Sequence, residues 1–127
     1  MTEPRSEHDR ERMRAELGFD RWQAIGYILS DGDYLGFNES DYRGAIAEYD
    51  KAWDILFTPW QRQTGGADIL EGIADFALRS DDADLARETL DSLLPRAEQI
   101  ARTSLRMACD KLALHVADLE RDQSLSK

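Results

Sequence analysis

Apolar residues recur along most of this chain at the three- and four-residue spacing of an amphipathic helix. Within 41–57, Ala45, Tyr49 and Ala52 lie four and three residues apart, so a helix places them on one face. Asp41 precedes this stripe and is the predicted N-cap, because its carboxylate can accept a hydrogen bond from a backbone N–H of the first turn. We predict a helix with a narrow stripe that another helix can approach closely.

The same spacing predicts four further helices and no strand. These helices cover residues 21–36, 67–79, 82–94 and 96–122, and the last of them is long and amphipathic. A loop is expected around 32–40, at the end of the first helix. No segment alternates apolar and polar residues for long enough to predict a strand. The expected fold class is therefore all-α.

Capping residues and prolines predict where these helices begin and end. Asp20, with a glutamine three residues later, is the predicted N-cap of the first helix. The acidic turn over 80–84 is expected to cap the fourth helix. Pro59 is expected to end the second helix and lead into a linker over 60–66, because proline disfavours a helical residue before it and lacks an N–H donor. Pro95 is expected to end the fourth helix for the same reason.

Gly26 lies inside the first predicted helix, where glycine is unfavourable. Glycine destabilises a helix interior by roughly 1 kcal/mol relative to alanine, so its presence needs a structural reason. The commonest reason is that a side chain would obstruct a neighbouring backbone. We therefore expect another helix to approach closely at Gly26.

Two pairs of predicted helices repeat the same apolar positions. Spacings of 0, 3, 4 and 7 residues are shared by Trp22, Ile25, Gly26 and Leu29 and by Leu70, Ile73, Ala74 and Ala77. The helices that follow them match in the same way, over Ala45, Tyr49 and Ala52 and over Ala86, Leu90 and Leu93. The chain therefore contains two copies of one helical hairpin.

This pattern resembles the tetratricopeptide repeat, a helix–turn–helix unit of about 34 residues. The first copy matches the W-x-x-L-G and A-x-x-x-F/Y-x-x-A signatures, with Pro59 near the position of the closing proline. In the second copy, alanine replaces the glycine, and leucines replace the aromatic residue and the last alanine. The resemblance implies two antiparallel hairpins over 20–95 in a right-handed α–α superhelix. It also implies a capping helix over 96–122, after a charged lead-in over 1–19. Burial of the last helix in a homodimer is the alternative to capping.

The net charge of −10 belongs to the middle of the chain. Residues 17–57 and 58–95 each hold eight acidic and three basic residues, whereas 96–127 holds five acidic and six basic residues. A negative field repels nucleic acid and favours basic partners, so we expect a basic protein partner and no nucleic acid. The alternative is that the charge serves solubility alone.

The resemblance also implies which residues line a partner-binding groove, because the first helix of each hairpin faces that groove in the family. The positions are Gln23, Tyr27 and Asp31 in the first hairpin and Asp68, Glu71, Asp75 and Arg79 in the second. The three acidic residues of the second hairpin share one helical face. An acidic groove is expected to accept a basic segment. The alternative is that these carboxylates are only a solvated surface.

The sequence carries no motif for catalysis, a metal or a cofactor. Asp31, Asp33 and Glu39 fall at ligand positions of a calcium-binding EF-hand loop, but Leu35 and Tyr42 occupy positions that require oxygen ligands. His115 is six residues after Cys109, which places the two on opposite faces of a helix. No P-loop, G-x-G-x-x-G, G-x-S-x-G or H-E-x-x-H motif is present. We expect no enzyme, no metal and no cofactor.

The chain also lacks the features of membrane and secreted proteins. No apolar run approaches the ~20 residues of a membrane span, and the first 14 residues contain no apolar stretch of a secretory signal. The single cysteine excludes an internal disulfide and suits a reducing compartment. We expect a cytoplasmic, bacterial protein.

Three functional hypotheses follow. The first is a non-enzymatic module that binds a basic protein, of the immunity-protein, chaperone or adaptor type. The second is a self-associating module that dimerises through the last helix. The third is an enzyme or metal-dependent regulator that uses the segment 31–39.

Overall fold

The computed structural model describes residues 7–125, and these residues form helices and no strand. The all-α prediction is therefore confirmed. Two π-helical segments, η1 and η2, continue neighbouring α-helices without a break. The elements in chain order are α1 (Glu7–Leu17), α2 (Phe19–Asp33), η1 (Tyr34–Asn38), α3 (Tyr42–Ile55), α4 (Pro59–Gln61), η2 (Arg62–Gly66), α5 (Ala67–Arg79), α6 (Ala83–Ala97) and α7 (Thr103–Leu125).

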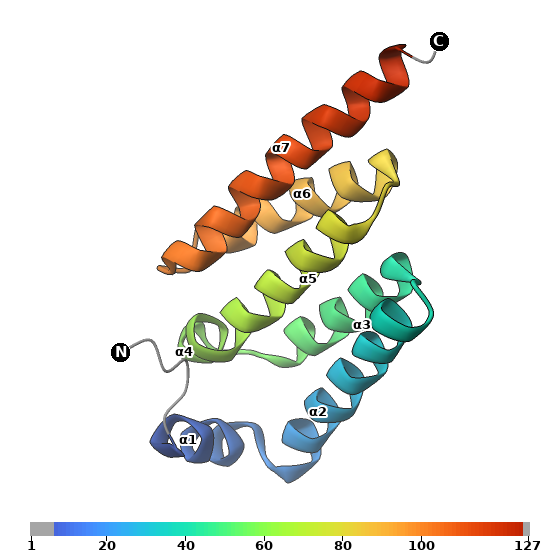
Figure 1. Ribbon diagram of the computed structural model, residues 1–127. Coiled ribbons are helices and arrows are strands. Elements are labelled where there is room, and N and C mark those ends of the chain that lie inside the picture. The colour runs from blue at the N-terminus through green and yellow to red at the C-terminus, as the bar shows by residue number, and fades with distance from the viewer. Residues whose placement is uncertain (1–6, 126–127) are drawn as a thin grey trace.

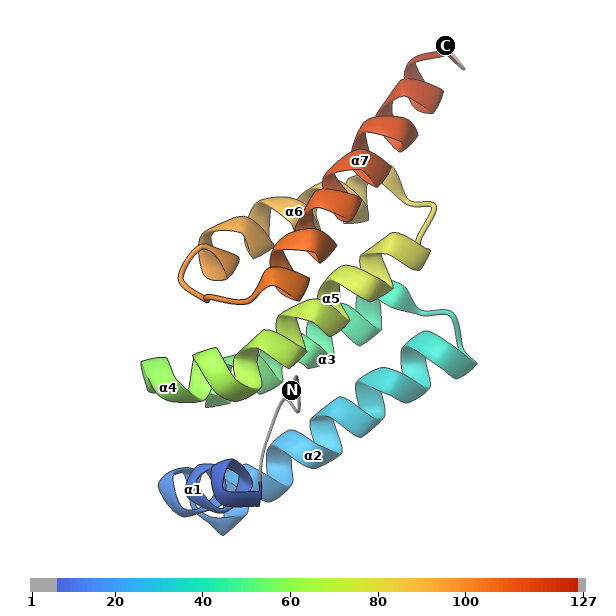
Figure 2. The ribbon, with the colours of Figure 1, turned by 60° about the vertical axis from the view of Figure 1, so that its left-hand side comes forward.

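The longer helices lie in two layers (Figures 1 and 2). Helices α2, α5 and α7 form one layer, and α3 and α6 form the other. Helix α3 packs against both α2 and α5, and α6 packs against both α5 and α7. Each helix of the second layer thus bridges two helices of the first.

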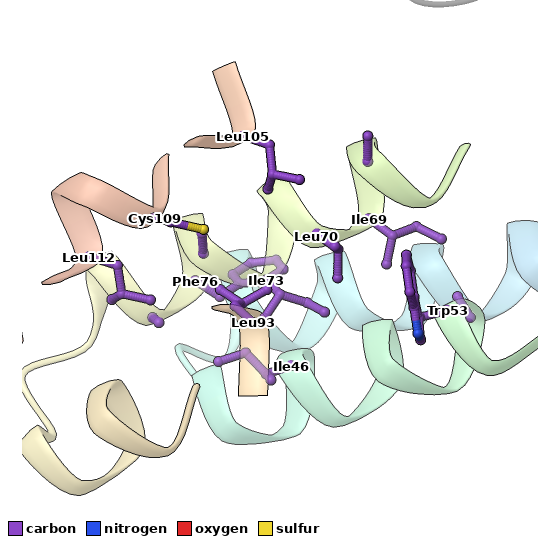
Figure 3. Packing of buried hydrophobic residues seen from close by; sticks show 14 of the residues in the cluster. Ile46, Trp53, Ile69, Leu70, Ile73, Phe76, Leu93, Leu105, Cys109 and Leu112 are labelled. Atoms are coloured by element: carbon purple, nitrogen blue, oxygen red, sulfur yellow. The ribbon is translucent and has the colours of Figure 1, made fainter. Parts of the chain in front are cut away.

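Helix α5 lies at the centre of the core, because its apolar residues face its neighbours on several sides. Seven of its thirteen side chains are buried. Leu70, Ile73 and Phe76 are at most 1% exposed. Figure 3 shows these side chains among residues of the neighbouring helices, including Leu93 and Leu112. The stripe that the sequence indicated in 67–79 is therefore the centre of the fold.

Two predicted helix starts are confirmed by hydrogen bonds. The carboxylate of Asp41 accepts a bond of 2.9 Å from the backbone N–H of Gly44 at the start of α3. The carboxylate of Asp82, within the predicted acidic turn, accepts a bond of 3.1 Å from Leu85 N at the start of α6. Both caps depend only on residues within one turn, which is why the sequence reveals them.

The N-cap of α6 allows a direct test of how much one capping hydrogen bond stabilises the protein. Replacing Asp82 with alanine is expected to lower the free energy of unfolding by about 1 kcal/mol, because it leaves a backbone donor of the first turn without its acceptor. Urea denaturation measures the difference. The matched control is Asp81→Ala, one residue earlier and exposed, which should change stability by only a few tenths of a kcal/mol. Equal losses would mean that charge near the helix start, and not the cap, is responsible.

The predicted boundaries of the first helix are wrong at both ends. Helix α2 begins at Phe19 after Gly18, whose φ of 84° stops the preceding helix, so Asp20 lies in the first turn and is not the N-cap. At the other end, the predicted loop around 32–40 is mostly helical, since η1 carries the helix on to Asn38. Packing of this segment on the core outweighs its loop-like composition.

The predicted linker over 60–66 is also helical. Thr58 is the N-cap of α4, and its hydroxyl accepts a bond of 3.1 Å from Gln61 N while Pro59 takes the first helical position. Proline is favoured there because the first N–H of a helix has no intrahelical acceptor. Pro59 therefore follows the end of α3, as predicted, but it also begins the helix that continues through η2 into α5.

Two further boundaries differ around Pro95. Helix α6 includes Pro95 and ends at Ala97, because a proline so close to the last turn removes only one hydrogen bond. Helix α7 begins at Thr103 and not at 96. Ile100, predicted to lie on the last helix, is instead buried in the turn before it.

The segment predicted as a charged lead-in contains a helix that packs on the core. Met13 and Leu17 of α1 are 3% and 4% exposed. The guanidinium of Arg12 lies 3.9 Å from the centre of the Trp60 ring. Gln61 donates a hydrogen bond of 3.2 Å to Glu16. Helix α1 is thus buried in the core through two apolar side chains and attached to α4 by an aromatic and a polar contact.

Candidate binding cleft

An apolar cleft of about 730 Å³ lies between α2 and α5. Its apolar lining includes Met13 of α1, Leu56 at the end of α3, Ile69 of α5 and, from α2, Trp22, Ile25 and Leu29. Polar side chains border it at Arg10, Gln23, Ser30 and Asp68. A cleft of this size and character is typical of ligand-binding sites.

The cleft exists because α2 packs against α3 but makes few contacts with α5, and the chain comes close to α5 only beyond α2, at η1. A Cβ atom placed on Gly36 would lie 2.2 Å from the Phe76 ring, and one on Gly32 would lie 2.8 Å from the Tyr49 ring. Elsewhere α2 and α5 make few direct contacts, whereas α5 and α7 pack together. Helix α1 contributes Met13 to the lining of the cleft.

Tyr49 of α3 lies where α2 and α5 come together. Its hydroxyl donates a hydrogen bond to Asp33, and its ring meets Phe76 edge-on at 5.2 Å between centres. A Cβ atom on Gly72 of α5 would lie 2.4 Å from the same ring. Burial, together with the hydrogen bond to Asp33, raises the pKa of Tyr49 above its usual range. The hydroxyl therefore stays protonated and keeps its role as donor.

Gly26 borders the cleft and not a neighbouring helix. A Cβ atom placed there would meet nothing within 4 Å. The expectation of a close helix contact at Gly26 is therefore wrong. The close contacts lie at Gly32 and Gly36, one and a half to three turns later in the same helix. No packing within residues 7–125 requires glycine at position 26.

Replacing Gly26 with alanine is therefore expected to stabilise the protein. The free energy of unfolding should rise by up to about 1 kcal/mol, because alanine is the better helix former and the added methyl group has room. Urea denaturation measures the change. A lower stability would contradict the open environment that the structure gives this residue.

A row of exposed aromatic side chains follows the cleft along α2 and η1. Phe19, Tyr27, Tyr34 and Phe37 are 65%, 64%, 57% and 55% exposed. Their spacings of eight, seven and three residues keep them near one helical face. The sequence analysis singled out only Tyr27 among them. The helical spacing of the aromatic residues is the signal from which the sequence could have identified the others.

The structure brings together three of the seven predicted groove residues. Gln23, Tyr27 and Asp68 line the cleft. The remaining four lie outside its lining, at Asp31, Glu71, Asp75 and Arg79. Asp31 is exposed on α2.

Arginines of this chain pair with the carboxylates predicted on α5. Arg102, in the turn before α7, lies 2.5 Å from Asp68 and 3.1 Å from Glu71. Burial would lower the pKa of Arg102, but its hydrogen bonds to these two carboxylates raise it above its ordinary value. Asp75 pairs with Arg79 at 3.0 Å. The face is therefore less acidic than the sequence predicted.

The other candidates for chemistry are a histidine that contacts the backbone and a buried cysteine. His115 Nε2 lies 2.7 Å from the carbonyl oxygen of Ser80. Cys109 is buried, and burial raises the pKa of its thiol. Within residues 7–125, no group of three or more histidine, cysteine or acidic residues is arranged to hold a metal ion. In the same part of the chain, no helix has both the length and the apolar character needed to cross a membrane.

Comparison of this chain with protein-family models, with curated proteins and with solved structures finds no match.

Proposed function

We propose that this protein is a non-enzymatic interaction module that holds a segment of a partner protein in the cleft between α2 and α5. The observation that carries the proposal is the cleft, which is apolar and bordered by exposed aromatic residues. Contiguous exposed apolar surface is uncommon on proteins that act alone, and aromatic residues are enriched where proteins bind one another.

The order of the helices supports a tetratricopeptide-like assembly as part of this proposal. Helices α2, α5 and α7 occupy one layer, as the first helices of successive hairpins do in that family (Figure 1). Helix α7 covers α5 and α6 and so takes the place of a capping helix. The proposed right-handed superhelix would present the cleft on the side that binds partners.

The proposed partner is a basic protein. The net charge of −10 attracts cations at long range and so raises association rates with basic proteins. Because Asp68 and Glu71 already pair with Arg102, we expect these two carboxylates to attract a basic partner less than unpaired carboxylates would. The proposed setting is the bacterial cytoplasm, in an immunity, chaperone or adaptor role.

The test is a pull-down from the source lysate at low salt, followed by mass spectrometry, with the wild-type chain and a cleft variant in parallel. The variant is Phe19→Ser/Tyr27→Ser, which removes two exposed aromatic side chains. The proposal expects one basic protein on the wild type, its release by salt and its loss from the variant. Recovery of the same proteins on both baits would contradict it.

A second candidate function is self-association through α7. Met107, Leu114 and Leu125 of this helix are 54%, 70% and 78% exposed and share one face. If this face forms a homodimer, light scattering will show a mass that rises with concentration, and Leu114→Glu will abolish that rise. A constant monomer mass would exclude the dimer.

A further inference from the structure

We infer that the occupant of the cleft is a single amphipathic helix of about three turns, apolar on the face toward α2 and cationic along its edges. This inference rests on the proposed function and specifies the class of ligand. It follows from the hydrogen bonding of the cleft walls, the length of the cleft along α2 and the charges beside it.

The cleft cannot satisfy the backbone of an extended peptide. Its walls are helices, whose backbone N–H and C=O groups are already bonded within each helix, so no free strand edge is present among the described residues. An extended segment would bury its own amide groups against Trp22, Ile25 and Ile69 with few partners. A helix satisfies those groups internally and presents only side chains.

The length of the cleft along α2 sets the length of the occupant. Residues of α2 line the cleft from Phe19 to Ser30, and these 11 steps of the helix span about 16 Å at 1.5 Å per residue. A ligand helix of about three turns lying along α2 spans the same distance. Gly26 lies within this stretch, and a Cβ atom there would meet nothing within 4 Å. It therefore offers a point where the backbone of the ligand helix can come close to α2.

Carboxylates lie beside the cleft on both sides, with Asp68 in its lining and Asp20, Asp31 and Asp75 outside that lining. Asp20 and Asp31 are exposed on α2, three turns apart and next to the aromatic row. Asp68 and Asp75 lie on α5, each with an arginine beside it. Cationic side chains at the edges of a ligand helix would face both pairs. An acidic ligand would face like charges along α2.

The test uses a fluorescein-labelled synthetic peptide of about 12 residues, the length of the cleft along α2, and the full chain. Leucines occupy one helical face of the peptide and lysines flank that face. Fluorescence anisotropy at low salt is expected to show saturable binding. Phe19→Ser/Tyr27→Ser is expected to weaken it at least tenfold, because aromatic side chains at the centre of an interface carry much of the affinity. Leu114→Ser, which removes an exposed apolar side chain from α7, is the matched control and should leave affinity unchanged.

Two comparisons test the charge and the helical form. Asp31→Lys is expected to weaken binding about threefold to fivefold, whereas Asp54→Lys, the same charge change on exposed α3 surface, should have little effect. A peptide of the same composition with two central prolines should lose binding at least tenfold. Equal binding of the proline peptide, or of a glutamate version of the helix, would overturn the inference.

The outcome separates this inference from the proposed function. If no peptide binds in the cleft but recovery of a lysate protein still requires Phe19 and Tyr27, the inference of a helical ligand is wrong and the proposed interaction module is supported. If recovery of the lysate protein does not depend on Phe19 and Tyr27 either, both proposals are wrong. If binding of the peptide is unaffected by Phe19→Ser/Tyr27→Ser, the peptide binds elsewhere and the inference is wrong.

Discussion

Replacing Phe76 with alanine is expected to lower the free energy of unfolding by about 3–5 kcal/mol. Phe76 is 1% exposed in the middle of the core, and its ring lies 5.2 Å from the centres of both the Phe37 and Tyr49 rings. Its removal leaves a cavity in the region where α2, α3 and α5 meet. Chemical denaturation measures the loss.

Phe37→Ala is the matched control for this substitution. Phe37 belongs to the same aromatic pair but is 55% exposed, so its truncation removes one ring contact and little buried area. We expect a loss of about 1 kcal/mol. Similar losses for both variants would mean that Phe76 is less central to the core than its burial indicates.

Replacing Gly36 with alanine is expected to lower the free energy of unfolding by about 1–3 kcal/mol, because an extra methyl group overfills a packed region. The three nearest atoms to the added Cβ, at 2.2, 2.7 and 3.0 Å, all belong to the buried Phe76 ring. The same substitution at Gly26 is expected to stabilise the protein. The same glycine-to-alanine substitution in one continuous helix is thus expected to lower the free energy of unfolding at Gly36 and to raise it at Gly26.

A double substitution identifies the cause of the Gly36 effect. Phe76→Leu removes ring atoms that the new methyl group would contact, so Gly36→Ala should cost less in a Phe76→Leu background than in the wild type. Coupling of this kind is expected for residues in contact. Additive losses would show that Gly36 is needed for backbone conformation and not for space beside Phe76.

The features that the sequence predicted correctly depend on neighbours within one or two turns. Asp41 caps a backbone N–H three residues away. The stripe in 67–79 predicted α5 with the bounds that the structure shows, because its apolar spacing is regular and its neighbours are polar or glycine. The all-α class follows from the same local periodicity.

The errors arise where a distant contact decides between two local possibilities. Composition favours a loop near Gly36, but packing against Phe76, forty residues later, holds the segment in a helix. Proline both ends and begins helices, and the capping box between Thr58 and Gln61 selects the second role for Pro59. The close helix contact predicted at Gly26, because glycine is unfavourable inside a helix, is absent, and the close contacts lie at Gly32 and Gly36.

The candidate site was predictable only in part for the same physical reason. The family resemblance implied that Gln23 and Tyr27 face a partner-binding groove, and both residues line the cleft. The resemblance could not show that Arg102, more than thirty residues away, pairs with Asp68 and Glu71. Nor could it show that α2 diverges from α5, since the angle between two helices depends on contacts with a third.

The attachment of α1 has a consequence for how the molecule opens. Only Met13 and Leu17 anchor this helix in the core, and it lies at one end of the chain of packed helices (Figure 1). Segments with few buried side chains open locally at a lower free energy than the whole molecule unfolds. Amide hydrogens of α1 should therefore exchange with deuterium well before those of α5. Each such opening removes Met13 from the cleft and gives a ligand access from that end without unfolding the rest of the molecule.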